Sequence, residues 1–84
     1  MDKQTNYSEI AIKNISIILT IRGLNVSEME KEIGVSNAYF SRLKRKGNPS
    51  FDMMVKMSKY LNISLDELIK TDFMDEIEER FKEK

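Results

Sequence analysis

The sequence contains no cysteine and no histidine among its 84 residues. Without cysteine, disulfides and thiolate metal sites are excluded, and a reducing cytoplasm is the expected location. Without histidine, the chain lacks the commonest general base and the usual zinc ligands. We therefore expect no enzyme activity, no metal, no cofactor and no small-molecule substrate.

Long apolar runs are also lacking. The longest one, residues 17–21, is interrupted by Thr20, and residues 1–9 are polar. A membrane-spanning helix needs about 20 consecutive apolar residues, and a signal peptide needs an apolar stretch before its cleavage site. The sequence predicts neither, and its length fits one domain with one hydrophobic core.

The net charge is zero, but the charges are unevenly distributed. Residues 1–32 carry four positive and five negative charges, residues 33–61 carry six and one, and residues 62–84 carry four and eight. Phosphate binding responds to local rather than total charge, so a neutral chain can still bind nucleic acid. The basic middle block is the candidate surface.

The first expected helix begins after a capping residue and ends near Gly23. Asn6 followed by Glu9, or Ser8 alone, can supply the cap. The branched isoleucines of residues 15–21 would also suit a strand. We favour a helix because apolar residues recur at three- and four-residue spacing and no second strand follows.

Four further helices are expected at residues 26–33, 37–46, 51–61 and 65–69, capped in turn by Asn25, Ser36, Ser50 and Ser64. Gly34 ends the first of them, and only Val35 separates it from the next cap. Such a short connection forces the two helices to meet at a steep angle. The sequence therefore predicts an all-α fold.

The helices at 26–33 and 37–46 form the motif that carries function. A helix enters the major groove only when a neighbour holds it across the DNA backbone, and two helices around a glycine turn supply that arrangement. With Phe40 and Leu43 turned inward, the residues beside them face outward. Because Asn can bridge adenine, Arg can fork onto guanine and Ala can touch a thymine methyl group, we expect base contacts from Asn37, Ala38, Ser41, Arg42 and Arg45.

Phosphate contacts are expected from the flanking residues Ser36, Tyr39, Lys44, Lys46 and Asn48. A basic run such as residues 42–46 is also typical of a solvated helix face. Its place at the end of the second of two tightly joined helices favours DNA binding.

The sequence resembles the Cro and lambda-repressor type of helix-turn-helix proteins, the xenobiotic-response-element (XRE) family, over about residues 14–69. The matching residues are Gly23-Leu24, Met29, Ile33, Gly34-Val35-Ser36, residues 39–43, Lys46-Gly47, Pro49-Ser50 and residues 61–68. The resemblance implies a compact five-helix DNA-binding domain, operator DNA as partner, a homodimer and a role in transcriptional regulation. We accordingly expect a polar tail at 1–7, a helix-turn-helix domain at 8–71 with its motif at about 26–45, and an extra C-terminal amphipathic helix at 72–84.

Two residues depart from the pattern of this family. Val26 stands where a polar residue, often Gln, braces a phosphate, so only the backbone N–H groups at that helix start remain for the contact. Glu30 stands where a small residue is usual, and an acidic group near the DNA face would weaken phosphate attraction. Pairing with Arg42 or Lys46 would accommodate it.

A third departure is an apolar patch on the first helix, formed by Ile17, Leu19 and Ile21. Exposed apolar patches usually mark a surface that something covers. One hypothesis is that the apolar face of the last helix covers the patch, within one chain or across a dimer; this face holds Phe73, Ile77 and Phe81. The alternative is that the residues of this patch belong to a wider hydrophobic core.

Two functions compete at this stage. The first is sequence-specific binding of double-stranded DNA by a dimeric transcriptional regulator, a repressor of the phage-repressor or antitoxin type. The alternative is a protein-interaction module that keeps the helix-turn-helix scaffold but does not bind DNA. Val26, Glu30, the zero net charge and the apolar patch motivate the alternative.

Overall fold

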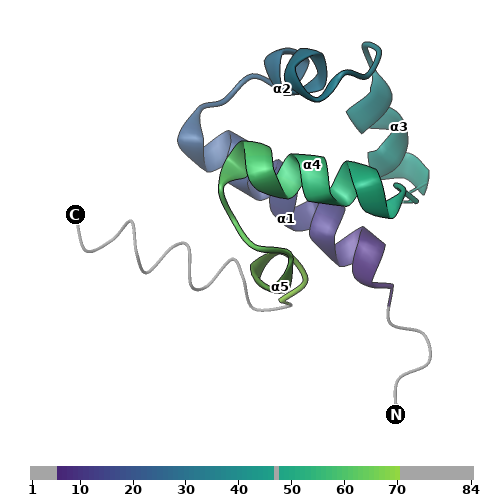
Figure 1. The fold of residues 1–84 in the computed structure, drawn as a ribbon, viewed down its shortest axis with the longest axis vertical. Coiled ribbons are helices and arrows are strands. Elements are labelled where there is room, and N and C mark those ends of the chain that lie inside the picture. Colours follow the sequence, from purple (N-terminus) through teal and green to yellow (C-terminus); the bar gives the residue numbers. More distant parts are fainter. Residues whose placement is uncertain (1–5, 47, 71–84) are drawn as a thin grey trace.

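The computed structural model describes residues 6–46 and 48–70, excluding the side chain of Lys46. Five helices and no strand occur in this part of the chain, which confirms the all-α prediction (Figure 1). They are α1 (Tyr7–Arg22), α2 (Val26–Ile33), α3 (Tyr39–Lys46), α4 (Phe51–Leu61) and α5 (Leu65–Leu68). The helix expected at residues 72–84 lies outside the described residues.

Helices α2 and α3 lie at one end of the molecule and α5 at the other, with α1 and α4 between them (Figure 1). α1 packs against α3 and α5, whereas α4 packs against α2 and α5. Neighbours in the fold therefore hold α3 from two sides, through α1 and α2. Among the described residues no single helix is long and apolar enough to cross a membrane; α1 and α2 pass that test only as a pair, bent by 119°.

Side-chain caps set most helix starts, as the sequence predicts. The side chains of Asn6, Ser50 and Ser64 accept hydrogen bonds from backbone N–H groups three residues on, at 3.0, 3.2 and 3.2 Å. Gly23 ends α1 with a φ of 68°, a left-handed conformation that glycine adopts without steric cost. α1 begins at Tyr7, so the last residue of the predicted polar tail is helical.

One hydrophobic core joins all five helices. The largest fully buried side chains are Phe40, Ile15, Ile18, Met29, Met57, Leu61 and Leu68. Leu19 is also buried, so the predicted apolar patch loses one member to the core, while Ile17 and Ile21 are half-buried. Each fully buried side chain of this size stabilises the fold by roughly 1.5–3 kcal/mol.

Two polar side chains of α1 tie it to distant backbone. The amide nitrogen of buried Asn14 donates to the carbonyl oxygens of Leu68 and Lys70, at 2.7 and 2.9 Å. The Arg22 guanidinium donates to the carbonyl oxygen of Leu61 at 2.7 Å. The ends of α4 and α5 are thereby fixed to α1, which in turn packs against α3.

Candidate nucleic-acid interface

The corner between α2 and α3 is built from two consecutive turns. The N–H groups of Gly34 and Val35 both donate to the carbonyl oxygen of Glu30, at 3.0 and 2.9 Å. Gly34 has a φ of 83°, as its predicted role in ending α2 requires. The carbonyl oxygen of Ser36 then accepts from the N–H of Tyr39 at 3.2 Å, which closes the second turn.

Helix α3 begins two residues later than the sequence predicts. It starts at Tyr39, whereas Asn37 and Ala38 belong to the preceding turn. The reason is the backbone of Ala38, whose φ of 71° is left-handed and cannot continue a right-handed helix. Two predicted base-reading side chains therefore project from the corner rather than from the helix.

Glu30 is buried, with 3% of its surface exposed. Its Oε2 accepts a hydrogen bond from the backbone N–H of Phe40 at 2.8 Å. The carboxylate is therefore turned into the fold rather than toward solvent. There it satisfies a donor at the start of α3, where the helix dipole also favours negative charge. Sequence reasoning missed this role because the contact spans ten residues and carries no local signal.

The inner side of α3 matches the prediction. Phe40 and Leu43 are buried in the core, and Tyr39 is half-buried beside them. Burial raises the pKa of the Tyr39 hydroxyl, and the nearby Arg42 charge partly opposes this rise. The Tyr39 hydroxyl thus stays a neutral donor at neutral pH.

All five predicted base-reading residues are exposed. Ser41, Arg42 and Arg45 lie on one side of α3, because a helix turns by about 100° per residue. One guanidinium nitrogen of Arg42 lies 3.5 Å from Ser36 Oγ, so this side chain reaches back to the corner. The structure thus brings the corner and the outer side of α3 together as one polar, cationic surface.

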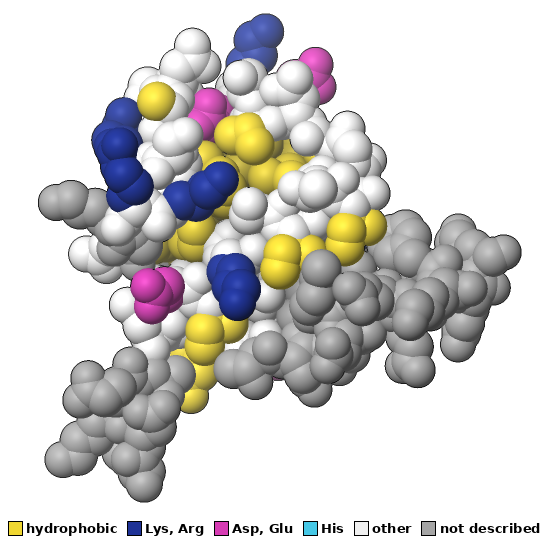
Figure 2. Space-filling model, turned by 180° about the vertical axis from the view of Figure 1, so that it is seen from behind, with side chains coloured by type: hydrophobic (Ala, Val, Ile, Leu, Met, Phe, Trp, Pro, Cys, Tyr) yellow, Lys and Arg dark blue, Asp and Glu magenta, His cyan; other side chains and the backbone are white. Residues whose placement is uncertain are grey.

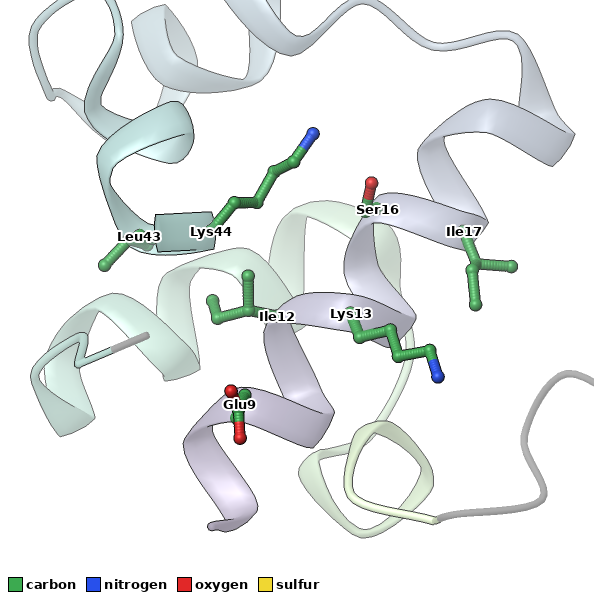
Figure 3. Close-up of a pocket in the computed structure, with 7 residues that line it drawn as sticks. All are labelled: Glu9, Ile12, Lys13, Ser16, Ile17, Leu43 and Lys44. Carbon is green, nitrogen blue, oxygen red and sulfur yellow. The ribbon is translucent and has the colours of Figure 1, made fainter. Parts of the chain in front are cut away.

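The predicted phosphate contacts surround this surface. Ser36, Lys44 and Asn48 are exposed, and the side chain of Lys46 lies outside the described residues. Lys44 leaves α3 on the side toward α1, with its Nζ 6.0 Å from the centre of the Phe40 ring (Figure 3). On the face shown in Figure 2, Lys and Arg side chains gather along one edge of the molecule, beside an apolar hollow.

That hollow is a cavity of about 310 Å³ between α1 and α3. Ile12, Ser16 and Leu43 contribute to its lining, and the amino group of Lys44 extends over it toward Ser16 (Figure 3). Glu9, Lys13 and Ile17 of α1 complete the lining, so both apolar and charged side chains border this cavity.

The start of α2 explains one departure and corrects one expectation. Val26 is half-buried and packs against the core, so its side chain serves the fold. The Asn25 side chain accepts hydrogen bonds from the N–H groups of Ser27 and Glu28, at 2.8 and 3.4 Å. The backbone donors expected to remain for a phosphate at these two residues are therefore already bonded within the chain.

Comparison with known proteins agrees with this architecture. The family model for helix-turn-helix proteins of the Cro and C1 type matches residues 15–68. No curated protein and no solved structure gives a match. The matched residues cover more than half of the chain and include all of α2, α3, α4 and α5. The chain therefore belongs to the helix-turn-helix family of the XRE type, a family of DNA-binding transcription regulators.

Proposed function

We propose that this protein binds double-stranded DNA sequence-specifically by inserting α3, together with the corner before it, into the major groove. The observation that carries the proposal is the two-sided character of α3. Its inner side is fixed by Phe40, Leu43 and the Glu30 hydrogen bond, while its outer side presents only polar and cationic residues. A reading surface must be both held in place and free to enter the groove.

In this proposal the exposed side chains divide into two groups. Arg42 and Arg45 are suited to guanine, Asn37 to adenine, and the methyl group of Ala38 to thymine, with Ser41 beside them. The second group anchors the protein on phosphates without reading sequence; it comprises Ser36, Tyr39, Lys44, Lys46 and Asn48.

We further propose that the protein acts as a homodimeric repressor, of the phage-repressor or antitoxin type. Two copies would place their α3 helices in successive major grooves, about 34 Å apart on one side of the DNA. A roughly palindromic operator follows from the two-fold symmetry of such a dimer. Occupying an operator that overlaps a promoter excludes polymerase by size alone, so no further domain is required.

Two of the four features that motivate the alternative, an interaction module without DNA binding, have a role in the fold. Glu30 is one of them, and its carboxylate is buried against the start of α3 rather than exposed beside the basic residues. Val26, a second motive, packs against the core. Both residues thus serve the fold of a reading unit, and this favours DNA binding.

Selection from a random pool of DNA duplexes tests the proposed function. The purified full chain should enrich one sequence class with two inverted half-sites about one helical turn apart. The Arg42→Ala variant, selected in parallel, should enrich a class that is degenerate at one or two positions of each half-site. An unenriched pool, recovered with a folded protein, would contradict sequence-specific binding.

A further inference from the structure

One flank of α1 carries a row of half-buried isoleucines, Ile10, Ile17 and Ile21, here named the isoleucine row. At about 100° per residue, these three side chains leave the helix within about 40° of one another. Ile17 also contributes to the lining of the cavity between α1 and α3 (Figure 3). Leu24, which is 38% exposed, follows directly after the end of the helix. The flank is thus apolar over most of its length.

Asn14 fixes another part of the chain beside this row. It lies between Ile10 and Ile17 along α1, and its buried amide group donates to the carbonyl oxygens of Leu68 and Lys70. Lys70 is the last described residue. The following segment, residues 71–84, therefore starts at a fixed point beside the middle of the isoleucine row.

The sequence of this segment fits the flank. Its apolar residues Phe73, Ile77 and Phe81 recur at four-residue spacing, which gives a helix one apolar side. As a helix its 14 residues would span about 21 Å, whereas the part of α1 from Asn14 to Ile21 spans about 10 Å. The segment is long enough to cover that part of the row in one pass.

We propose that residues 71–84 form a helix that docks on the isoleucine row of the same chain and runs toward Leu24. Counting from the Lys70–Asn14 contact in parallel register places Phe73 beside Ile17 and Ile77 beside Ile21. The four-residue step from Phe73 to Ile77 equals the step from Ile17 to Ile21. Both apolar pairs therefore form together.

The isoleucines support this direction over the opposite one. Running toward Leu24 places the segment against two isoleucines of the row, Ile17 and Ile21, whereas the opposite direction offers Ile10 alone.

We assign the isoleucine row to the segment of the same chain, rather than to a second copy, because that segment begins next to the row. Only two residues separate Lys70 from Phe73, so the segment is present at the row at an effective concentration in the millimolar range. A second copy at micromolar concentration has to displace it. The proposal is independent of DNA binding, since none of the residues it uses is among those that we propose contact DNA.

Disulfide trapping tests the proposal directly, because the chain has no cysteine of its own. The full-length double variant Ile21→Cys with Ile77→Cys is compared with Ile21→Cys with Glu79→Cys in a glutathione redox buffer. Residue 79 lies on the other side of the proposed helix. We expect the first pair to form an intramolecular disulfide at least ten times faster. Equal rates for the two pairs, or disulfides mainly between chains, would overturn the proposal.

A second measurement starts from variants in which the segment itself is unchanged. In the single variant Ile21→Cys, the thiol should react with an aromatic disulfide reagent at least ten times more slowly than the thiol of Thr20→Cys, whose position is exposed. Adding Ile77→Asp to the first variant should remove this protection, whereas adding Glu79→Gln should leave it. Protection that survives Ile77→Asp would mean that the core alone shields the row.

Discussion

Glu30 belongs to α2, but its carboxylate completes the first turn of α3 through the N–H of Phe40. Burying a charge is costly unless strong hydrogen bonds offset the loss of water. Here the acceptor meets a donor that has no partner within its own helix. The residue that departs from the pattern of the family thus fixes the helix that we propose reads DNA.

Replacing this carboxylate should destabilise the fold. We expect Glu30→Ala to lower the free energy of unfolding by about 2 kcal/mol, because the N–H of Phe40 is left buried without a partner. Urea denaturation measures the change. Glu32→Ala removes an exposed carboxylate of the same helix and should change stability by no more than about 0.5 kcal/mol. Equal effects of the two variants would show that the hydrogen bond contributes nothing.

Ala38 should show a conflict between stability and function. Its left-handed backbone is strained for any residue with a side chain, so Ala38→Gly should raise the free energy of unfolding by about 0.5–1 kcal/mol. The same change removes a methyl group that we propose contacts thymine. We expect a higher melting temperature together with weaker discrimination at one base pair. A variant that is less stable than the parent would contradict the strained conformation.

The two classes of proposed DNA contact should separate in binding assays. Arg42→Ala should lose about 1–3 kcal/mol of preference for the selected operator over a mismatched one. Lys44→Ala should weaken binding to both duplexes alike, because a phosphate contact reads no sequence. Fluorescence anisotropy with matched duplexes checks both. Loss of preference in the lysine variant, with none in the arginine variant, would reverse the assignment.

At the scale of elements, α5 depends on α1 for its place. A helix of four residues has no stability of its own, so its position rests on Leu68 in the core and on the two hydrogen bonds from Asn14. Asn14→Ala should lower the free energy of unfolding by about 2 kcal/mol, because two carbonyl groups lose their donors. Thr20→Ala, at an exposed site of the same helix, is the control.

Hydrogen exchange identifies where the Asn14→Ala variant loosens. Amides of α5 should exchange faster than in the parent, while those of α3 should change little, because α3 is held separately by α2 and the core. A uniform increase over all helices would indicate a global effect instead. That result would contradict a local role for Asn14.

The helices also show which structural features can be predicted from the sequence alone. The bounds of α2 and α4 follow from local signals, a capping side chain at one end and a residue that tolerates positive φ at the other. The start of α3 cannot be predicted in this way, because an alanine such as Ala38 gives no sequence signal for a left-handed backbone. The buried acceptor that holds α3 comes from another helix, so only the tertiary structure reveals it.

Helical periodicity likewise does not predict how exposed a given side chain is. Phe51 continues the spacing of Met54, Met57 and Leu61, yet it is 72% exposed while the other three are buried. The helical repeat assigns a residue to a side of its helix, but it does not say how far along that side the neighbouring helices extend. The side chains of the proposed reading surface were predictable because two adjacent helices and the core residues between them define it.

For the molecule as a whole, the zero net charge conceals a separation of positive from negative charge along the chain. The cationic groups concentrate between residues 33 and 61 and the acidic groups follow after residue 62. We therefore expect long-range attraction to DNA to be modest and local attraction at α3 to be strong. We expect binding that depends on close contact with phosphates and is consequently sensitive to salt.

A salt titration of binding tests the central claim most directly. The affinity for the selected operator and for a shuffled duplex is measured by anisotropy between about 50 and 200 mM salt. The account predicts a steep linear fall of log K with log salt for both duplexes, of a size set by several phosphate contacts, and tighter operator binding throughout. An affinity that does not change with salt, or the same affinity for both duplexes, would contradict reading of DNA by α3.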